Sequence, residues 1–321
     1  MFSLAGSFAG LPTLYGVIVR RRTAMERMTG SRLSIYGMSR GDFGMWDRNR
    51  RNMLGTMDDM PQYREYMTQA LELAHRGAGW VNPNPLVGTV VVRDSEILAA
   101  GYHDRYRGPH AERMAFDYAD EHGIDMHGAT VIDTLEPCCH VGSQPACTDL
   151  ILSHGITRVV VGSIDPNPIV AGKGLRILEE TGVEVVYDVM RAECDAINRH
   201  FFHYITTGKP YIVDGRRRAG ESDSEYAVRR RELYATYAAV LAGTESDVPD
   251  ESFAHFNGPV QAVGADEVVI GGHRPLLLEA GALACTDPDE WLSELGKRKI
   301  DSLIVESDEA FERLSMACQK D

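Results

Sequence analysis

The sequence predicts an α/β protein in which helices cover both faces of a mixed sheet. Two observations support this prediction. Between residues 61 and 206, short runs rich in valine and isoleucine alternate with stretches whose apolar residues recur at helical spacing. Strands that alternate with helices in this way form layered α/β structures. The chain has 321 residues, of which 44% are hydrophobic, so it can also fill a substantial core.

The predicted elements follow one another in a regular order. Residues 63–77 have the apolar spacing of a helix that stops at Gly77, and residues 86–93 and 96–103 are typical of a hairpin that turns at Asp94 and Ser95. The same patterns then predict helices over 110–121, 147–154, 174–182 and about 190–206, and strands over 129–134, 158–163 and 183–189.

Beyond Pro210 the periodicity weakens, and we expect a second, smaller α/β region whose boundary lies between residues 208 and 215. Residues 213–232 are highly charged and show little periodicity, and a helix is expected over 234–243. The other expected elements are short strands within 262–272 and over 301–307, and a helix over 288–298.

Residues 1–56 differ sharply in composition from the rest of the chain. They contain nine arginines, no lysine and three acids, a formal charge of +6, in a chain whose net charge is −14. We expect a disordered extension or a stretch translated from an early start codon; an organellar transit peptide is the alternative. The expected location is accordingly the cytoplasm, or an organelle if this segment is a genuine transit peptide. The expected parts of the chain are 1–56, 57–210 and 211–321.

The chemistry is concentrated in residues 110–147. Three of the six cysteines fall within ten positions there, which suits a metal site better than a disulfide framework. The imidazole of His110 and the thiolates of Cys138 and Cys147 would leave the fourth tetrahedral position of Zn²⁺ to water, as in catalytic zinc sites. Glu112 would carry protons from the water to the ring nitrogen and the departing amine. Hydrolytic deamination of an aminopyrimidine or aminopurine needs this set of groups.

A structural interpretation of the same residues is that histidine caps a helix and the cysteines fill the core, as isolated ones often do. Their occurrence together, in this order and across a helix and a strand, favours the metal site. Cys139 adjoins Cys138 on the turn and is expected not to be a ligand. The acidic net charge argues against a nucleic-acid binder, so the expected partner is a small molecule, with no membrane and no nucleic acid.

Four blocks of sequence resemble a known family. They are NPNPLVGTVVV, GYHDRYRGPHAERMAF, TLEPCCHVGSQPACTDLI and VVVGSIDPNPIVAGKGLRILEETGVEV. Over about residues 63–211 they closely resemble the pyrimidine deaminase domain of the bifunctional deaminase–reductase family of riboflavin biosynthesis. Eight residues separate Cys138 from Cys147, a spacing that this branch of the cytidine-deaminase-like superfamily uses. The resemblance implies the cytidine-deaminase-like three-layer α/β/α sandwich, zinc on His110, Cys138 and Cys147, and Glu112 as general acid and base.

The resemblance also implies the residues that line the substrate pocket, namely Asn84, His103, Asp165 and Asn167. Simple turn formation is the alternative role of the two Asn-Pro stretches, because both residue types favour turns. Lys173 precedes a helix and could meet the substrate phosphate, or it is a solvated surface lysine. Family members commonly have a basic residue where this chain has Ser143. The missing charge could weaken substrate binding or shift the phosphate contact to Lys173.

In that family an NADPH-dependent reductase follows the deaminase. Only pieces such as VDGRRRAGES and LGKRKIDSLIVES resemble it here, and Ser307 and Asp308 stand where the family has glycines that let a dinucleotide approach the backbone. We therefore expect residues 211–321 to be a truncated, degenerate reductase-like region without reductase activity. A second copy of the chain and a separate reductase of the pathway are the other expected partners.

The expected function is zinc-dependent hydrolytic deamination of diaminohydroxyphosphoribosylaminopyrimidine to the amino-uracil phosphoribosyl product, with release of ammonia, in riboflavin biosynthesis. Two alternatives remain open. One is a deaminase of another nucleobase or nucleoside. The other is a catalytically idle assembly partner, in which the fold is kept while the activity is lost.

Overall fold

The computed structural model describes residues 61–141, 145–242, 262–263, 267–268, 276–279 and 287–318. All of them belong to Asp58–Asp321, one of the two units into which the chain divides. The expected extension over residues 1–56 and the Ser143 position lie outside the described residues. Within the described part, no helix has the length and apolar character needed to cross a bilayer.

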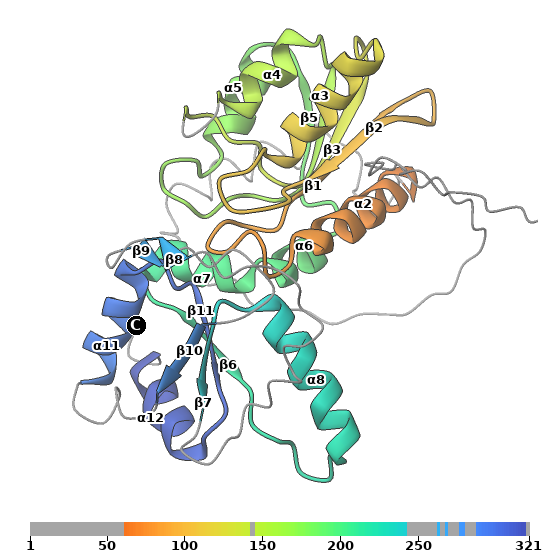
Figure 1. Ribbon diagram of the computed structural model, residues 1–321. Coiled ribbons are helices and arrows are strands. Elements are labelled where there is room, and N and C mark those ends of the chain that lie inside the picture. The colour runs from red at the N-terminus through yellow and green to blue at the C-terminus, as the bar shows by residue number, and fades with distance from the viewer. Residues whose placement is uncertain are drawn as a thin grey trace, which may run out of the picture. The chain divides into compact units, whose positions relative to one another are not determined.

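A mixed five-stranded sheet, in the order β2-β1-β3-β4-β5, forms the centre of residues 61–207 (Figure 1). Its strands are β1 (Gly88–Arg93), β2 (Glu96–Tyr102), β3 (Thr130–Leu135), β4 (Arg158–Ser163) and β5 (Glu184–Val186). β1 is antiparallel to both of its neighbours, whereas β3, β4 and β5 are parallel. Asp94 and Ser95 have φ values of 53° and 66°, as a tight hairpin turn requires, and confirm the predicted hairpin.

Alternate side chains of this sheet pack against helices on its two faces. One face packs against α3 (Ala111–His122), α4 (Cys147–Ser153) and α5 (Lys173–Glu180), with Phe116 and Val159 buried between the layers. The other face packs against α2 (Pro61–Ala74), which a 3-10 turn (His75–Gly77) extends, and against Cys194. The predicted three-layer α/β/α sandwich with a mixed sheet is therefore confirmed.

The single helix predicted over residues 190–206 is wrong. Two helices, α6 (Arg191–Ile197) and α7 (Arg199–Thr207), meet at the buried Asn198. The Asn198 side chain accepts from the Leu86 N–H at 2.7 Å and donates to the Leu86 carbonyl at 2.8 Å. The chain leaves helical geometry at Asn198, where the side chain is held by the backbone of a residue distant in sequence, and no glycine or proline marks the break.

A second, parallel sheet has the strand order β10-β7-β11-β6. Its strands are β6 (Tyr211–Asp214), β7 (Ala239–Ala242), β10 (Leu276–Glu279) and β11 (Ser302–Val305), and a separate short pair consists of β8 (Ala262–Val263) and β9 (Glu267–Val268). Helix α8 (Asp223–Thr236) packs on one face of the parallel sheet, and α11 (Pro288–Lys297) and α12 (Asp308–Cys318) pack on the other (Figure 1). These elements form the predicted smaller α/β region.

One prediction within this region needs correction, and several elements were missed. The helix expected over residues 234–243 is wrong, because α8 ends at Thr236 and the following apolar run is strand β7, buried on both faces of the sheet. The helix lies instead in the charged stretch before it. Ser222 accepts from the Glu225 N–H while Glu225 accepts from the Ser222 N–H, a capping box that starts α8. Strands β6 and β10 and helix α12 were not predicted.

Candidate active site

Segments from four strands meet at one edge of the first sheet. In the parallel pair β3 and β4, the carboxyl ends lie side by side at this edge. Because β1 runs antiparallel to β3, and β2 antiparallel to β1, the start of β1 and the end of β2 lie at the same edge. The residues that follow or precede these ends are the predicted site residues Asn84, His103, His110, Cys138 and Asp165. The topology thus explains why groups so distant in sequence come together.

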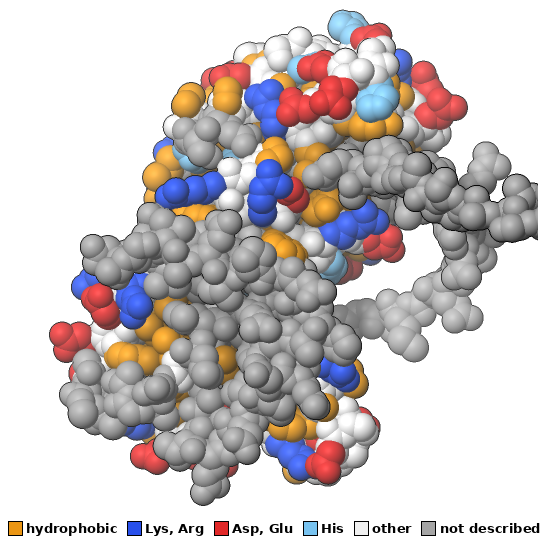
Figure 2. All heavy atoms as spheres, viewed as in Figure 1, with side chains coloured by type: hydrophobic (Ala, Val, Ile, Leu, Met, Phe, Trp, Pro, Cys, Tyr) orange, Lys and Arg blue, Asp and Glu red, His pale blue; other side chains and the backbone are white. Residues whose placement is uncertain are grey.

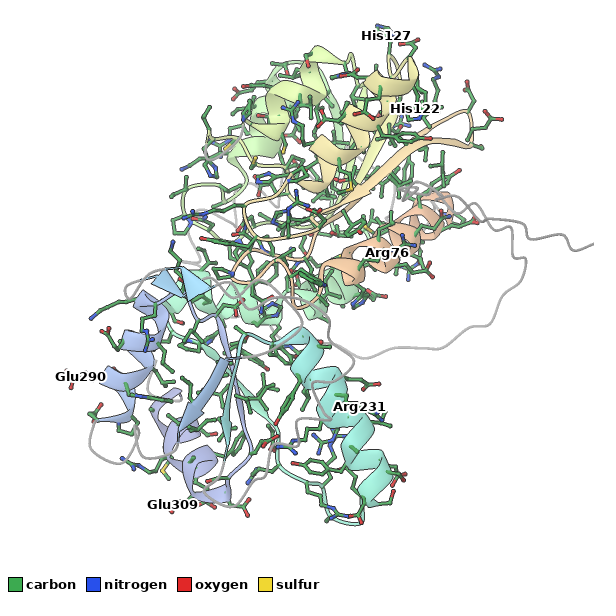
Figure 3. All side chains as sticks on the ribbon, in the orientation of Figure 1. Arg76, His122, His127, Arg231, Glu290 and Glu309 are labelled. Carbon is green, nitrogen blue, oxygen red and sulfur yellow. The ribbon has the colours of Figure 1, made fainter. Side chains whose placement is uncertain are left out.

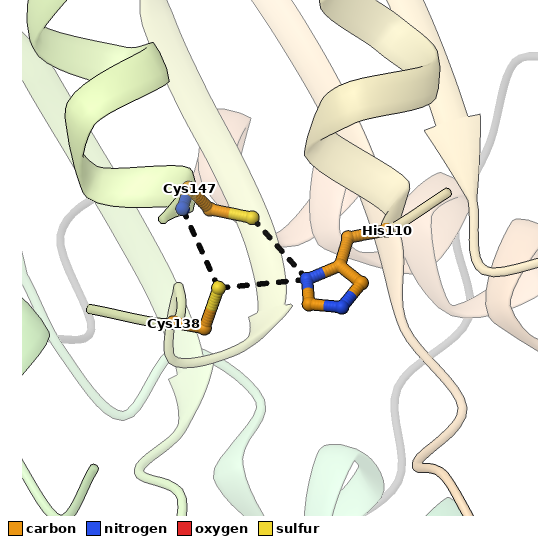
Figure 4. A group of neighbouring side chains, drawn as sticks. All are labelled: His110, Cys138 and Cys147. Carbon is orange, nitrogen blue, oxygen red and sulfur yellow. Dashed lines mark hydrogen bonds between the residues drawn. The ribbon is translucent and has the colours of Figure 1, made fainter. Parts of the chain in front are cut away.

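The three predicted zinc ligands form one cluster (Figure 4). His110 is the N-cap of α3, Cys138 lies on the turn after β3, and Cys147 is the first residue of α4. The Nδ1 atom of His110 lies 3.5 Å from the Cys138 sulfur and 3.4 Å from the Cys147 sulfur. The neighbouring Cys139 is not part of this cluster, as expected.

These distances can be tested against the needs of zinc. A tetrahedral ion with bonds of about 2.0 Å to nitrogen and about 2.3 Å to sulfur holds its nitrogen and sulfur ligands about 3.5 Å apart. Both nitrogen-to-sulfur separations in the cluster match that value. One imidazole and two thiolates are also ligands that zinc prefers. The donor chemistry of His110, Cys138 and Cys147 and both nitrogen-to-sulfur separations therefore fit a zinc ion.

The electrostatics of the cluster favour a thiolate. Hydrogen bonds from Cys147 and from His110 lower the pKa of the Cys138 thiol to about 4. The Cys147 N–H, at the start of α4, lies 3.4 Å from the same sulfur. The hydrogen bond to Cys138 also raises the pKa of His110. Because the Cys138 thiol is already deprotonated at neutral pH, little free energy has to be spent on losing its proton when a metal binds.

Glu112 lies beside the cluster, in the first turn of α3. Its side chain is only 3% exposed, and burial raises its pKa above the ordinary value for a glutamate. After burial, the groups that act on its pKa include Cys138, His110 and Cys147, so the carboxyl lies near the three ligands. A buried carboxyl in this position can exchange protons with a small molecule held at the cluster.

Asn84 and His103 form a hydrogen-bonded pair whose donor and acceptor can be assigned. The His103 Nδ1 atom lies 2.8 Å from the Pro109 carbonyl, which only accepts, so Nδ1 carries the proton. Burial lowers the pKa of His103 to about 4, and the ring is therefore neutral near pH 7. Its Nε2 atom must then accept a hydrogen bond from the Asn84 Nδ2 atom at 3.1 Å. The amide oxygen of Asn84 is turned away from His103.

Asp165 and Asn167 lie on the loop after β4, and both side chains stabilise that loop. Asp165 accepts from the Asn167 N–H at 2.8 Å, and Asn167 accepts from the Ile169 N–H at 3.1 Å. These are the turns that Asp and Asn commonly form. Burial, and to a smaller extent Cys138, raises the pKa of Asp165, so the carboxyl also lies near the metal-binding turn. Asp165 and Asn167 can therefore form turns and also line a pocket, and their place in the substrate pocket stays a prediction.

Lys173 begins α5 and is exposed. Its ammonium group donates to the carbonyls of Pro168 and Ile169 at 3.0 and 3.1 Å. The N–H groups of Gly172 and Gly174 donate to the Glu136 carboxylate and are not directed at a ligand. Glu136 was not among the predicted site residues, although it lies two residues before Cys138. A phosphate contact at this position remains a prediction. It would have to be made by the Lys173 side chain, because the neighbouring N–H groups already bind Glu136.

Two other histidines lie away from this site. His122 ends α3 and His127 follows it in the next turn; both are exposed and lie at the periphery in Figure 3. The cluster of His110, Cys138 and Cys147 is the one group within the described part of the chain whose ligand atoms could hold a metal together.

Comparison with known proteins places this fold and site in a class. The family model described as "Cytidine and deoxycytidylate deaminase zinc-binding region" matches residues 60–163, which include the whole ligand cluster. Fold and site together therefore define a deaminase domain of the cytidine deaminase-like class.

Two relatives and one solved structure narrow the class to a family. Riboflavin biosynthesis protein RibD of Actinobacillus pleuropneumoniae is 36% identical over 306 residues, which cover 79% of this chain and 79% of that protein. The diaminohydroxyphosphoribosylamino-pyrimidine deaminase of Buchnera aphidicola is 41% identical over 147 residues, 46% of this chain and 98% of that protein. The chain belongs to the RibD family of riboflavin biosynthesis proteins. The crystal structure of a deaminase/reductase of this kind from Thermotoga maritima has a TM-score of 0.63 at 30% identity and covers 79% of this chain and 84% of its own.

Proposed function

We propose that this protein catalyses the hydrolytic deamination of diaminohydroxyphosphoribosylaminopyrimidine in riboflavin biosynthesis. Water replaces the ring amino group, the product is the amino-uracil phosphoribosyl compound, and ammonia leaves. The observation that carries the proposal is the ligand cluster of His110, Cys138 and Cys147 with the buried Glu112 beside it. The Buchnera relative, which is named for this deaminase, matches over nearly its whole length.

His110, Cys138 and Cys147 would hold the zinc ion. Zinc bound by three protein ligands lowers the pKa of water and supplies hydroxide near neutrality. These residues would leave one coordination position for water, because the cluster contains only three ligands among the described residues. Loss of any one ligand would leave too few protein groups to hold the ion.

Glu112 would move the protons of the reaction. Its raised pKa lets the carboxyl take a proton from the attacking water and release it again during one turnover. One proton goes to the ring nitrogen next to the carbon under attack, and the amine leaves as ammonia after it has gained another. Its place in the first turn of α3, whose N-cap is the ligand His110, holds the carboxyl close to both reacting groups.

Asn84, oriented by its hydrogen bond to His103, would recognise the substrate ring. Because its Nδ2 atom donates to His103, its oxygen is directed to other partners and can accept from an amino group of the ring. A pyrimidine with two amino groups offers such donors. Asp165, Asn167 and Lys173 complete the proposed pocket, with Lys173 as the candidate for the phosphate.

The surface supports a small-molecule substrate in preference to nucleic acid. On the face shown in Figure 2, basic and acidic side chains are interspersed over the described residues, and these residues form no continuous basic patch on that face. A nucleic-acid binder needs a basic surface to neutralise phosphates. The net charge of −14 points the same way.

We also propose that residues 211–321 form a truncated, degenerate reductase-like region without reductase activity. In open parallel sheets, ligands bind at the carboxyl ends of the strands. At the end of β11, the Glu306 side chain is 3% exposed and binds Arg230 through two contacts of 2.6 and 2.7 Å. The Tyr234 hydroxyl donates to the same carboxylate at 2.6 Å. This buried network at the carboxyl end of β11 supports the proposal, because it uses the Glu306 carboxylate for internal contacts.

The compartment of the protein stays a prediction: the cytoplasm, or an organelle if residues 1–56 act as a transit peptide. A second copy of the chain and a separate reductase remain the proposed partners.

The proposal is tested by incubation of the purified full chain with freshly generated diaminohydroxyphosphoribosylaminopyrimidine, with cytidine and guanine in parallel. We expect ammonia from the phosphoribosylated substrate and a much slower reaction with the other two. If ammonia were released only from cytidine or guanine, the protein would be a deaminase of that compound and the proposed substrate would be wrong. No ammonia from any of them, with zinc bound, would favour the idle assembly partner.

A further inference from the structure

The Glu136 carboxylate joins two loops of the proposed site. Glu136 follows β3, is 5% exposed and lies two residues before the ligand Cys138. Its Oε2 atom accepts from the N–H of Asp165 at 3.3 Å and of Gly172 at 2.8 Å. Its Oε1 atom accepts from the N–H of Gly174 at 3.1 Å. All three donors belong to the segment 165–174, which contains the proposed pocket residues Asp165, Asn167 and Lys173.

These bonds replace a helix cap that the segment itself cannot form. The N-cap of α5 is Gly172, which has no side chain and a left-handed backbone with φ of 80°. The first N–H groups of a helix need acceptors, and an N-cap side chain normally supplies one. Here the acceptor comes from Glu136 on the neighbouring loop. The start of α5 is therefore fixed relative to the turn that carries Cys138.

The close approach of the two backbones gives independent evidence for this connection. A Cβ atom at Gly174 would lie 2.4 Å from the Pro137 carbonyl oxygen, a distance that real Cβ atoms do not reach. Glycine at this position lets α5 begin directly against the Pro137–Cys138 turn. Side-chain and backbone contacts thus hold the same two segments together.

We propose that Glu136 is a positioning residue that sets the place of the 165–174 segment relative to the metal-binding turn. The inference rests on the proposed function, because it assigns Asp165 and Asn167 to the substrate pocket. Glu136 is not one of the three clustered ligands, and it would act through the loop contacts alone. Its carboxylate holds the loop so that the pocket residues meet a ring bound beside Cys138.

Substitution Glu136→Gln tests this role with little change in size. The glutamine keeps one oxygen but directs an N–H donor at backbone N–H groups, so the segment should detach at one or more of its three contacts. We expect KM for the phosphoribosylated substrate to rise about tenfold or more while kcat stays within about threefold, since ground-state positioning is lost and the proton chemistry is not. Zinc content should equal that of the wild type.

Glu179→Gln is the matched control. It lies at the other end of α5, where Glu179 accepts from the Tyr187 hydroxyl at 2.6 Å, so it makes the same change from carboxylate to amide on the same helix, away from the site. We expect an unchanged KM. An equal rise in KM for both variants, or loss of zinc in Glu136→Gln, would overturn the inference, because the effect would then be general loosening or damage to the metal turn.

Hydrogen exchange supplies a readout that does not depend on activity. In Glu136→Gln, the amides of Asp165, Gly172 and Gly174 should exchange at least about tenfold faster than in the wild type, with α3 unchanged. A second variant, Gly174→Ala, keeps the carboxylate but forces the two loops apart, and should give the same change in the same peptides. Unchanged exchange in both folded variants would reject the inference. If the wild type shows no turnover, the proposed function fails, and this exchange experiment still tests the link between the two loops.

Discussion

The Nε2 atom of His103 accepts a hydrogen bond from the Asn84 amide at 3.1 Å, and this contact orients the amide within the site. The orientation follows from the bond between His103 and the Pro109 carbonyl, which fixes the tautomer. His103, which lies 19 residues from Asn84 in sequence, therefore decides which atom of the amide is turned away from the ring.

Asn84→Asp should weaken substrate binding strongly. The new carboxylate would face the lone pair of His103 Nε2 and would lose the donor that holds it, so we expect KM to rise by about tenfold to a hundredfold. Asn167→Asp is the matched change, because Asn167 uses its oxygen to accept from the Ile169 N–H and aspartate keeps that role. It should raise KM less. Steady-state kinetics on both variants would decide, and equal effects would contradict the assigned orientation.

The two adjacent cysteines should differ in metal binding. Cys138→Ser removes one of the three clustered ligands, and we expect the purified protein to lose most of its zinc. Cys139→Ser should retain zinc at the wild-type ratio, since Cys139 lies outside the cluster. Zinc per chain, measured by atomic absorption, gives the answer. Loss of zinc from the Cys139 variant alone would show that the ligand has been assigned to the wrong cysteine.

Asp165 should make the stability of the protein depend on pH. Burial raises its pKa from 3.8 to about 6, so the folded protein binds this proton more tightly than the unfolded chain does. The stabilising contribution is complete below about pH 3.8 and is lost as the pH rises through about 6.

Asp165→Asn keeps the acceptor for the Asn167 N–H and removes the titration. Between about pH 5 and about pH 7.5, the free energy of unfolding of the wild type should therefore fall by about 1 kcal/mol relative to the variant. Urea unfolding of both proteins at the two pH values measures this difference. A constant difference would show that Asp165 does not titrate in this range.

The C-terminal region, residues 211–321, should not use NADPH. Because Arg230 and Tyr234 occupy the Glu306 carboxylate at the end of β11, we expect NADPH to leave the melting temperature unchanged within about 1 °C. The full chain should also oxidise no NADPH when supplied with its own deaminated product, while a bifunctional RibD protein does so in the same assay. Oxidation of NADPH by this chain would contradict the proposal.

The sequence predicted the first sheet well and the later elements poorly, for a physical reason. From residue 61 to residue 189, local patterns and tertiary structure agree, as the turn at Asp94 and Ser95 illustrates. The helix break at Asn198 depends on Leu86, which lies 112 residues away, so no local pattern could reveal it. In residues 234–243, a short apolar run is compatible with a helix or a buried strand, and only the sheet around it decides for β7.

In the site, too, some residues could be predicted from local sequence and others depend on distant contacts. His110, Cys138 and Cys147 were predicted because side chains of these types seldom occur in this order and context except at a metal site. Glu136 was missed because its three partners are backbone N–H groups 29 to 38 residues away, which leave no trace in the side-chain pattern. The same bonds explain why the start of α5 is less open to a phosphate than the position of Lys173 suggested.

The most direct test of the proposed function compares the wild type with Glu112→Gln. Both purified proteins are incubated with the phosphoribosylated diaminopyrimidine, and ammonia and zinc are measured on the same samples. We expect ammonia from the wild type, and a variant that retains zinc while its kcat falls by about 10²-fold to 10⁴-fold, since only the proton carrier has been removed. A zinc-loaded wild type that releases no ammonia, or a variant that is as active as the wild type, would contradict the proposed function.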